Sequence, residues 1–214
     1  MINRSRVLIA DDHTLVAELC KKLLESEFDV VGTVSDGHAL VRASARLRPD
    51  VVVVDVAMPV LNGLDAGQKV LQELRTVKLV YVTMNPNPEV AAEAFRRGAS
   101  GYLLKTCAAS EMVAAVRAVL QGKIYLSSAL SRDDVTYLRR QTKKLVEEED
   151  KLTERQREVL QLLAEGKVMK EIGAVLNMTT RTVAFHKYRI MEALDVKSNA
   201  ELVRYAVRNH IVAA

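Results

Sequence analysis

A doubly wound α/β domain followed by a small all-helical domain is the fold class that the sequence predicts. Short runs rich in β-branched residues recur at regular intervals up to about residue 105, and helical periodicity separates them. From residue 152 onward the periodicity is helical throughout. The chain has 214 residues, more than the roughly 100 to 150 of a usual single domain, so two domains are expected.

Five strands are expected in the first domain. They occupy residues 7–10, 30–34, 51–54, 79–83 and 101–104 and alternate with helices, which predicts a parallel sheet covered on both faces. The run at 51–54 is four consecutive valines without polar alternation, which is typical of a central strand buried on both faces.

Apolar spacing locates the helices at the two ends of this domain. The first helix is marked by Leu15, Leu19, Leu23 and Leu24, and the last by Val113, Val116 and Leu120. We therefore place the α/β domain at residues 1–121.

A polar segment at residues 122–150 reads as a linker, because it is rich in Ser, Arg, Lys and Glu. Leu130, Val135 and Leu138 define either a short amphipathic helix within it or part of a solvated connection.

The last domain, residues 151–214, contains four predicted helices. A capping box formed by Thr153 and Gln156 opens the first and Gly166 closes it, while Thr179 caps the third. The other three helices are expected at residues 170–176, 180–194 and 199–209. A tight turn at 176–178 makes this a helix-turn-helix module.

Composition excludes several classes of protein. Apolar runs are far shorter than the roughly 20 residues of a membrane span, and the N-terminus lacks a secretory signal, so a cytoplasmic protein without a membrane partner is expected. Cys20 and Cys107 lie far apart and lack metal-ligand spacing, which predicts two reduced thiols.

Charge is distributed unevenly along the chain. Residues 1–121 carry 14 Lys and Arg and 14 Asp and Glu, and residues 122–150 carry six of each. Residues 151–214 carry 11 basic and 7 acidic side chains, so the whole excess of +4 lies in the helical domain. Such a distribution favours a nucleic-acid binder.

Polar side chains end four of the predicted strands. Asp11 and Asp12 follow the first strand and Asp55 follows the valine run, so their carboxylates converge at one edge of the sheet and require a divalent cation, for which Mg²⁺ is the natural candidate. Thr83 and Lys105 reach the same edge, and together this set suits a phosphoryl group.

These residues resemble the receiver domain of two-component response regulators. The motifs are Ala10-Asp11-Asp12, Asp55-x-x-Met58-Pro59, Val82-Thr83 and Gly101-Tyr102-Leu103-Leu104-Lys105, and the match covers about 121 residues. The resemblance implies a flavodoxin-like fold and phosphorylation of Asp55 by a cognate histidine kinase.

The same resemblance assigns roles to the other site residues. Asp11, Asp12, Asp55 and the backbone carbonyl of Ala57 would hold Mg²⁺, while Thr83 and Lys105 would bind the phosphoryl group. Tyr102 would be the aromatic side chain that turns inward with Thr83, or a packing residue.

Met84 departs from the family, in which many receivers place a small residue after the threonine. One hypothesis is that Met84 slows phosphoryl entry or loss at Asp55, and the alternative is core packing.

The helical domain resembles the LuxR-type helix-turn-helix domain. The motifs are Leu152-Thr153-x-Arg155-x-Arg157-Glu158-Val159-Leu160, Gly166-x-x-x-Lys170-Glu171-Ile172 and Thr182-Val183-x-x-His186. With the receiver, this domain is similar to the NarL/FixJ family of regulators.

The helix at 180–194 has the features of a recognition helix, with Val183, Ile190 and Leu194 turned inward. Basic side chains suit phosphates or guanine edges, and Phe185 suits either a thymine methyl group or the core. Candidate DNA contacts are Thr180, Arg181, Thr182, Ala184, Phe185, His186, Lys187, Tyr188 and Arg189. Val168 removes a likely N-cap from the preceding helix, at a cost of about 1 kcal/mol.

The predicted function is a transcriptional regulator whose promoter binding and dimerisation respond to phosphorylation of Asp55, with double-stranded DNA and RNA polymerase as partners. Enzymatic activity would be confined to self-phosphorylation and self-dephosphorylation. Two alternatives are a phosphorylation-independent DNA-binding protein and a Mg²⁺-dependent phosphohydrolase, although Ala57 stands where the second carboxylate of such a hydrolase would be. Leu202, Val203, Ala206 and Val207 form either a dimer surface or part of the core.

Overall fold

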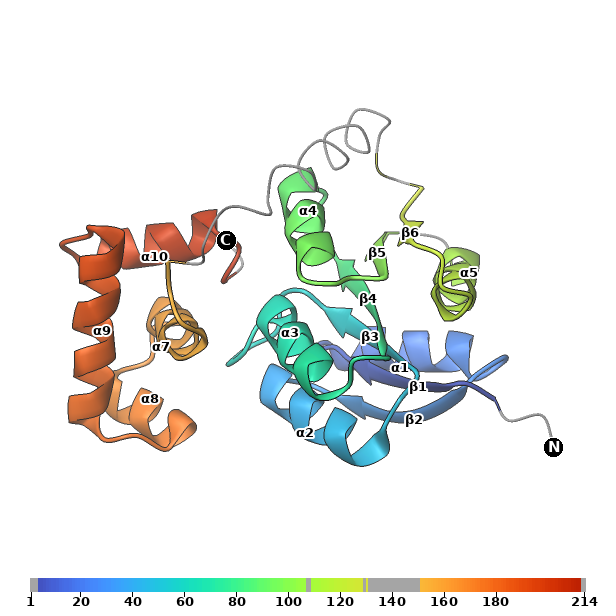
Figure 1. Cartoon of the computed structure of the whole chain (residues 1–214), viewed down its shortest axis with the longest axis horizontal. Helices are drawn as coiled ribbons and strands as arrows, with labels where there is room; N and C mark the ends of the chain where they lie inside the picture. The colour runs from blue at the N-terminus through green and yellow to red at the C-terminus, as the bar shows by residue number, and fades with distance from the viewer. Residues whose placement is uncertain (1–3, 107–108, 129, 131–150, 213–214) are drawn as a thin grey trace. The chain divides into compact units, whose positions relative to one another are not determined.

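The computed structural model describes residues 4–106, 109–128, 130 and 151–212, which form two compact units (Figure 1). One unit contains the sheet with α1 to α5, and the other contains α7 to α10. Most of the proposed linker helix and Cys107 lie outside the described residues, whereas Cys20 is buried and is not part of a disulfide. Among the described helices, none has the length and apolar character needed to cross a membrane.

The sheet consists of parallel strands in the order β2-β1-β3-β4-β5-β6. This order confirms the doubly wound arrangement. From β1 the chain adds β2 on one side, and it then returns to add β3 and the later strands on the other side of β1. The strands are β1 (Arg6–Ala10), β2 (Asp29–Val34), β3 (Val51–Asp55), β4 (Lys78–Thr83), β5 (Gly101–Leu104) and β6 (Tyr125–Leu126).

The five predicted strands are confirmed, but β6 lies in the segment predicted to be linker. Tyr125 N–H donates to the Ser100 carbonyl at 3.0 Å, and Ser127 N–H donates to the Tyr102 carbonyl at 2.8 Å. Two residues are too few to show an apolar pattern, so this strand depends on the edge that β5 offers.

Helices cover both faces of the sheet. They are α1 (Thr14–Leu24), α2 (Gly37–Leu47), α3 (Gly63–Glu73), α4 (Pro88–Arg96) and α5 (Ala109–Leu120). On one face α1 and α5 pack against Val7, Ile9, Val51 and Val53. On the other, α2 and α3 lie side by side. The valines of β3 are therefore buried from both sides, as predicted.

The apolar stripe predicted for α1 is partly wrong. Leu15 is 86% exposed and Leu19 58% exposed, whereas Ala17, Cys20 and Leu24 face the sheet. The helix carries apolar side chains on two faces, and the smaller residues Ala17 and Cys20 occupy the face next to the sheet.

A buried ion pair connects α3 with the end of α4. Arg97 is the C-cap of α4, and its guanidinium donates to Asp65 of α3 and to Glu93 of α4. Arg96 binds Glu93 from the exposed side at 2.5 Å. Arg97 and Asp65 are both buried, so Asp65 depends on the guanidinium for compensation of its charge, and the guanidinium depends on Asp65 together with Glu93.

The second unit is built from α7 (Glu154–Ala164), α8 (Met169–Leu176), α9 (Thr180–Leu194) and α10 (Asn199–Arg208). The capping box is confirmed: Gln156 N–H donates to the Thr153 hydroxyl, and Thr153 N–H donates to the side-chain amide oxygen Oε1 of Gln156. Gly166 follows the end of α7 with φ of +82°. The core contains Val159, Leu160, Leu162, Ile172, Val183, Ile190, Leu202 and Ala206.

The turn between α8 and α9 forms as predicted. Asn177 adopts the left-handed conformation at φ 54°, and Thr179 caps α9 by accepting a hydrogen bond from Thr182 N–H at 3.1 Å. A Cβ on Gly173 would lie 2.6 Å from the carbonyl oxygen of Met178, so a glycine here lets the turn pack closely against α8. At the start of α8, Glu171 accepts from Val168 N–H, which partly replaces the missing side-chain cap.

We expect Arg97→Ala to lower the free energy of unfolding by about 3–5 kcal/mol, because it leaves Asp65 buried without its guanidinium. Urea unfolding followed by circular dichroism measures this loss. Arg96→Ala is the matched control, since its partly exposed ion pair is worth about 1 kcal/mol or less. Equal losses in both variants would contradict the assignment.

Stability should also depend on the charge of Glu93. Burial by itself would raise the pKa of Glu93, but hydrogen bonds and positive charge from Arg96 and Arg97 outweigh it and lower the pKa to about 2. Because the pKa is lower in the folded state, the ionised Glu93 stabilises the fold at pH values above 4.5, the ordinary pKa of this group. This stability is lost as the pH falls toward 2. The difference in unfolding free energy between wild type and Glu93→Gln should therefore shrink from pH 6 to pH 3. A difference that stays constant would show that the charge contributes nothing.

Candidate acidic site and candidate nucleic-acid interface

The three predicted aspartates meet at the carboxyl ends of β1 and β3. These strands are parallel neighbours with Ala10 opposite Val54, so the residues that follow them, Asp11 and Asp55, lie side by side. Ligand atoms of Asp11, Asp12, His13 and Asp55 all lie within 4.8 Å of one another. Asp55 and Asp11 are buried, while Asp12 is more open to solvent.

Lys105 bridges two of these carboxylates. Its Nζ lies 2.8 Å from Oδ2 of Asp11 and 2.8 Å from Oδ2 of Asp55. Burial raises the pKa of Asp55 above its ordinary value, against the opposing effect of the Lys105 ammonium. Burial alone would lower the pKa of Lys105, but its hydrogen bonds to Asp11 and Asp55 raise it. Lys105 therefore stays charged and shares the site with the carboxylates.

The donor set fits a hard divalent cation. Three carboxylates and one ammonium leave a net negative charge, and carboxylate oxygens are the ligands that Mg²⁺ prefers. Ala57 N–H donates to Oδ1 of Asp55 at 3.2 Å. The role of the Ala57 carbonyl as a metal ligand stays a prediction.

Thr83 and Tyr102 are connected through one loop residue. The buried Thr83 hydroxyl accepts a hydrogen bond from Asn85 N–H at 3.1 Å. The Tyr102 hydroxyl donates to the carbonyl oxygen of the same residue at 3.4 Å, and the Tyr102 side chain is completely buried. Tyr102 thus points inward, and burial raises the pKa of its hydroxyl.

Met84 is 66% exposed, so the core-packing interpretation of this residue is wrong. It directly follows Thr83, whose backbone carbonyl accepts from Lys105 N–H at 2.7 Å. Its effect on access to Asp55 stays a prediction.

The predicted DNA-contacting side chains of α9 differ in their exposure to solvent. Arg181, Phe185, Tyr188 and Arg189 are exposed, whereas Ala184, His186 and Lys187 are half-buried. Val183 and Ile190 are buried in the core as predicted, and Leu194 packs against it while partly buried. Phe185 is 58% exposed, so a core role for this residue is wrong.

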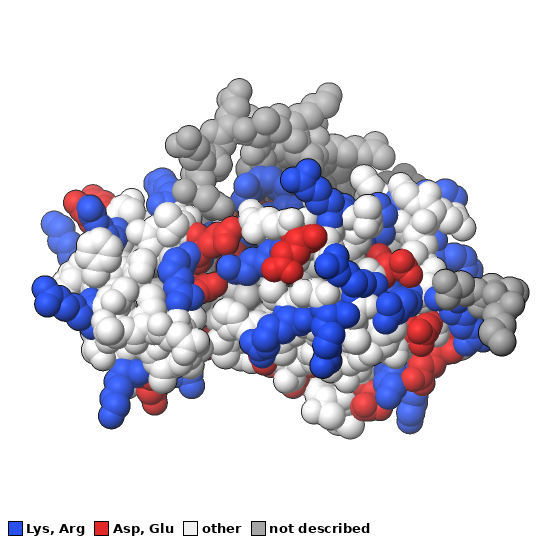
Figure 2. All heavy atoms as spheres, turned by 60° about the horizontal axis from the view of Figure 1, so that its bottom comes forward, with Lys and Arg blue, Asp and Glu red and all other residues white. Residues whose placement is uncertain are grey.

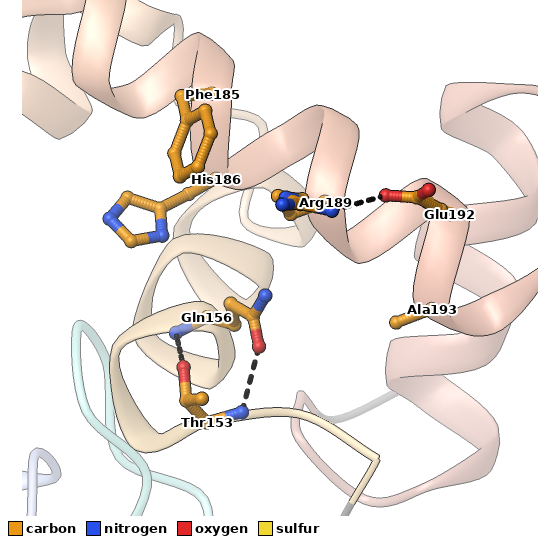
Figure 3. A pocket seen from close by; sticks show the side chains of 7 residues that line it. All are labelled: Thr153, Gln156, Phe185, His186, Arg189, Glu192 and Ala193. Carbon is orange, nitrogen blue, oxygen red and sulfur yellow. Dashed lines mark hydrogen bonds and ion pairs between the residues drawn. The ribbon is translucent and has the colours of Figure 1, made fainter.

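Phe185 and Arg189 form one wall of a hollow of about 420 Å³ between α7 and α9, with the capping box opposite (Figure 3). Arg189 lies between Phe185 and Glu192 and donates to the Glu192 carboxylate at 2.9 Å. On the face drawn in Figure 2, the surface of the C-terminal helices at the left carries Lys and Arg side chains, together with Asp and Glu side chains, around an uncharged area.

Residues of α10 proposed as a dimer surface are divided between core and surface. Leu202 and Ala206 are buried in the core of this unit, Val203 is exposed, and Val207 is half-buried. A dimer contact through Leu202 or Ala206 would therefore require the core to open.

Known protein families match both units. Residues 7–117 match the response regulator receiver domain, and residues 150–206 match the bacterial regulatory proteins of the luxR family. The chain is 36% identical over 209 residues to the transcriptional regulatory protein LiaR of Bacillus subtilis, covering 97% of this chain and 99% of LiaR.

The chain belongs to the NarL/FixJ family of response regulators.

Further relatives match nearly the whole of this chain. The response regulator UvrY of Escherichia coli K12 is 31% identical, with 98% of this chain and 95% of UvrY covered. A solved structure of the RcsB response regulator of Salmonella typhimurium has a TM-score of 0.63 and 26% identity, covering 97% of this chain and 99% of RcsB.

Two residues of the receiver site were missed by sequence reasoning. His13 Nδ1 lies 2.8 Å from Oδ1 of Asp12 and 3.4 Å from Oδ1 of Asp11. Its position directly after the aspartates was the available signal. Gly63 is the first residue of α3 and packs closely against the end of β3 at Asp55. No local sequence pattern predicts this close packing.

We expect Gly63→Ala to destabilise the receiver by about 1–3 kcal/mol, the usual cost of overpacking. A Cβ at this position would lie 1.9 Å from the Asp55 carbonyl oxygen, so the end of β3 or the start of α3 must move. Thermal or urea unfolding measures the loss. Gly32→Ala is the control, because its Cβ would meet only side-chain atoms at 3.3 Å and 3.5 Å. A Gly63→Ala variant as stable as wild type would contradict the close approach.

Proposed function

We propose that Asp55 accepts a phosphoryl group from a histidine kinase and that this event switches dimerisation and promoter binding by the luxR-type domain. The observation that carries the proposal is the bridge from Lys105 to Asp11 and Asp55, at 2.8 Å from each. It gathers an acceptor carboxylate, further metal-binding oxygens and a cation at one sheet edge, beside Thr83.

The transfer forms a bond from phosphorus to an oxygen of Asp55 and breaks the bond from phosphorus to the nitrogen of the kinase histidine. Asp11, Asp12, Asp55 and the carbonyl of Ala57 would hold Mg²⁺, which when bound offsets the charge of the carboxylates and the phosphoryl oxygens. Lys105 supplies a further positive charge from the protein itself.

Thr83 and Tyr102 carry the change away from the site. A Thr83 hydroxyl that turns to donate to a phosphoryl oxygen alters its bond with Asn85 N–H, and Tyr102 binds the carbonyl of the same residue. The loop before α4 (Pro88–Arg96) is thereby linked to both side chains. Phosphorylation would shift the receiver between two arrangements of this loop.

The partners of the second unit follow from its recognition helix and its relatives. Thr180, Arg181, Thr182 and the exposed side chains of α9 would contact promoter DNA, with Ala184, His186 and Lys187 beside them. One solved relative is an RcsB–DNA complex that is 28% identical, with a TM-score of 0.56, and another contains RcsB dimers bound to DNA. A dimer on paired half-sites, with RNA polymerase as a further partner in the cytoplasm, completes the proposal.

DNA binding with and without a small phosphodonor and Mg²⁺ tests the proposed switch. We expect the treated wild-type chain to bind its selected duplex at least about fivefold more tightly than the untreated chain, the lower range of allosteric coupling. Asp55→Asn, which keeps the size of the side chain, should show no response. Asp55→Asn binding as tightly as treated wild type would instead indicate regulation that is independent of phosphorylation.

A further inference from the structure

The recognition helix α9 exposes an aromatic side chain that the core does not use. Phe185 is 58% exposed, while Val183 and Ile190 of the same helix are completely buried. An exposed phenyl ring forfeits most of the free energy that its burial would contribute. The ring is therefore available for an apolar contact that forms only when the helix binds its target.

Three neighbouring side chains constrain the orientation of the ring (Figure 3). The guanidinium carbon of Arg189, one turn along the helix, lies 5.7 Å from the ring centroid, which is within the range of a cation–π contact. Glu192 accepts a hydrogen bond from Arg189 at 2.9 Å, and the His186 ring meets Phe185 edge-on at 5.8 Å between centroids. The ring is thus partly pre-organised before binding.

Charge on either side of the ring suits a nucleic-acid backbone. Arg181 lies one turn before Phe185 and Arg189 one turn after it, and both are exposed. Arg181 is placed to contact a phosphate beside the groove, while Arg189, bound to Glu192 and stacked on the ring, keeps the ring directed at the base edges.

The chemistry of the major groove restricts what such a ring can recognise. Base edges there present hydrogen-bond donors and acceptors, which a phenyl group would desolvate without replacing their bonds. The thymine C5 methyl group is the apolar exception. A phenyl ring on a helix that reads the major groove therefore favours a T·A pair.

We propose that Phe185 is a specificity-determining residue that packs against the methyl group of one thymine in each half-site. Arg189, held by Glu192, is a positioning residue for the ring. The inference rests on the proposed DNA-binding function and adds to it the base that this position selects.

Replacement of thymine by deoxyuridine isolates the methyl group, because the two bases differ at the edge by that group alone. The full chain, treated with a small phosphodonor and Mg²⁺, first selects a duplex from a random-sequence pool. Each thymine of that duplex is then replaced singly. At one position per half-site we expect the wild-type chain to bind about fourfold more weakly, which corresponds to the loss of one buried methyl group.

Phe185→Ala should bind the thymine and deoxyuridine duplexes equally at that position, while Phe185→Leu should retain part of the preference. Val175→Ala is the control, because Val175 is an exposed apolar residue on α8 and the variant should keep the full preference. Circular dichroism checks that each variant keeps its helices.

Two outcomes would overturn this proposal and leave the proposed DNA-binding function intact. One is a wild-type chain that binds its duplex but does not discriminate between thymine and deoxyuridine at any position. The other is a Phe185→Ala variant that keeps the wild-type ratio of affinities for the two duplexes. If the Phe185→Ala variant binds DNA as wild type does, we would assign the exposed ring to a contact with another protein instead. If the treated chain enriches no duplex at all, the proposed DNA-binding function fails as well.

Discussion

Repulsion among the carboxylates at the ends of β1 and β3 is the constraint on which the receiver depends. Asp11 and Asp55 are buried beside each other, and the Lys105 ammonium, 2.8 Å from both, offsets only part of their charge. Burial and the neighbouring charge of Asp11 raise the pKa of Asp55, and the Lys105 ammonium opposes them. The same arrangement that costs stability brings together carboxylate oxygens of the kind that a divalent cation prefers.

The supporting fold holds this unfavourable cluster in place. The valines of β3 are buried on both faces, and α3 begins so close to Asp55 that only glycine fits at position 63. Arg97 and Asp65 tie α3 to the end of α4, while the loop before α4 contacts Thr83 and Tyr102 through Asn85. The acidic site is thus closely packed where the charges are held, and Thr83 and Tyr102 are connected to the loop by hydrogen bonds with Asn85.

The two units differ in how well local sequence predicted them. Helix boundaries in the second unit follow from the Thr153 capping box, the Thr179 cap and the left-handed Asn177, all of which act within a few residues. In the first unit, Leu15 and Leu19 misled because α1 carries apolar residues on two faces, and β6 escaped notice because two residues show no pattern. The exposure of Phe185 and Met84 likewise depends on packing that their neighbours in sequence do not specify.

By itself the sequence determined the α/β and helical units, the strand-end positions of Asp11, Asp12, Asp55, Thr83 and Lys105, and the concentration of positive charge in the last 64 residues. These properties depend on residue type and short spacing. The tertiary structure decided that Lys105 bridges two carboxylates, that His13 joins the aspartates, and that Phe185 is exposed beside the Arg189 guanidinium. Each of these depends on distances set by how strands and helices pack, and such distances are not encoded in the periodicity of any single segment.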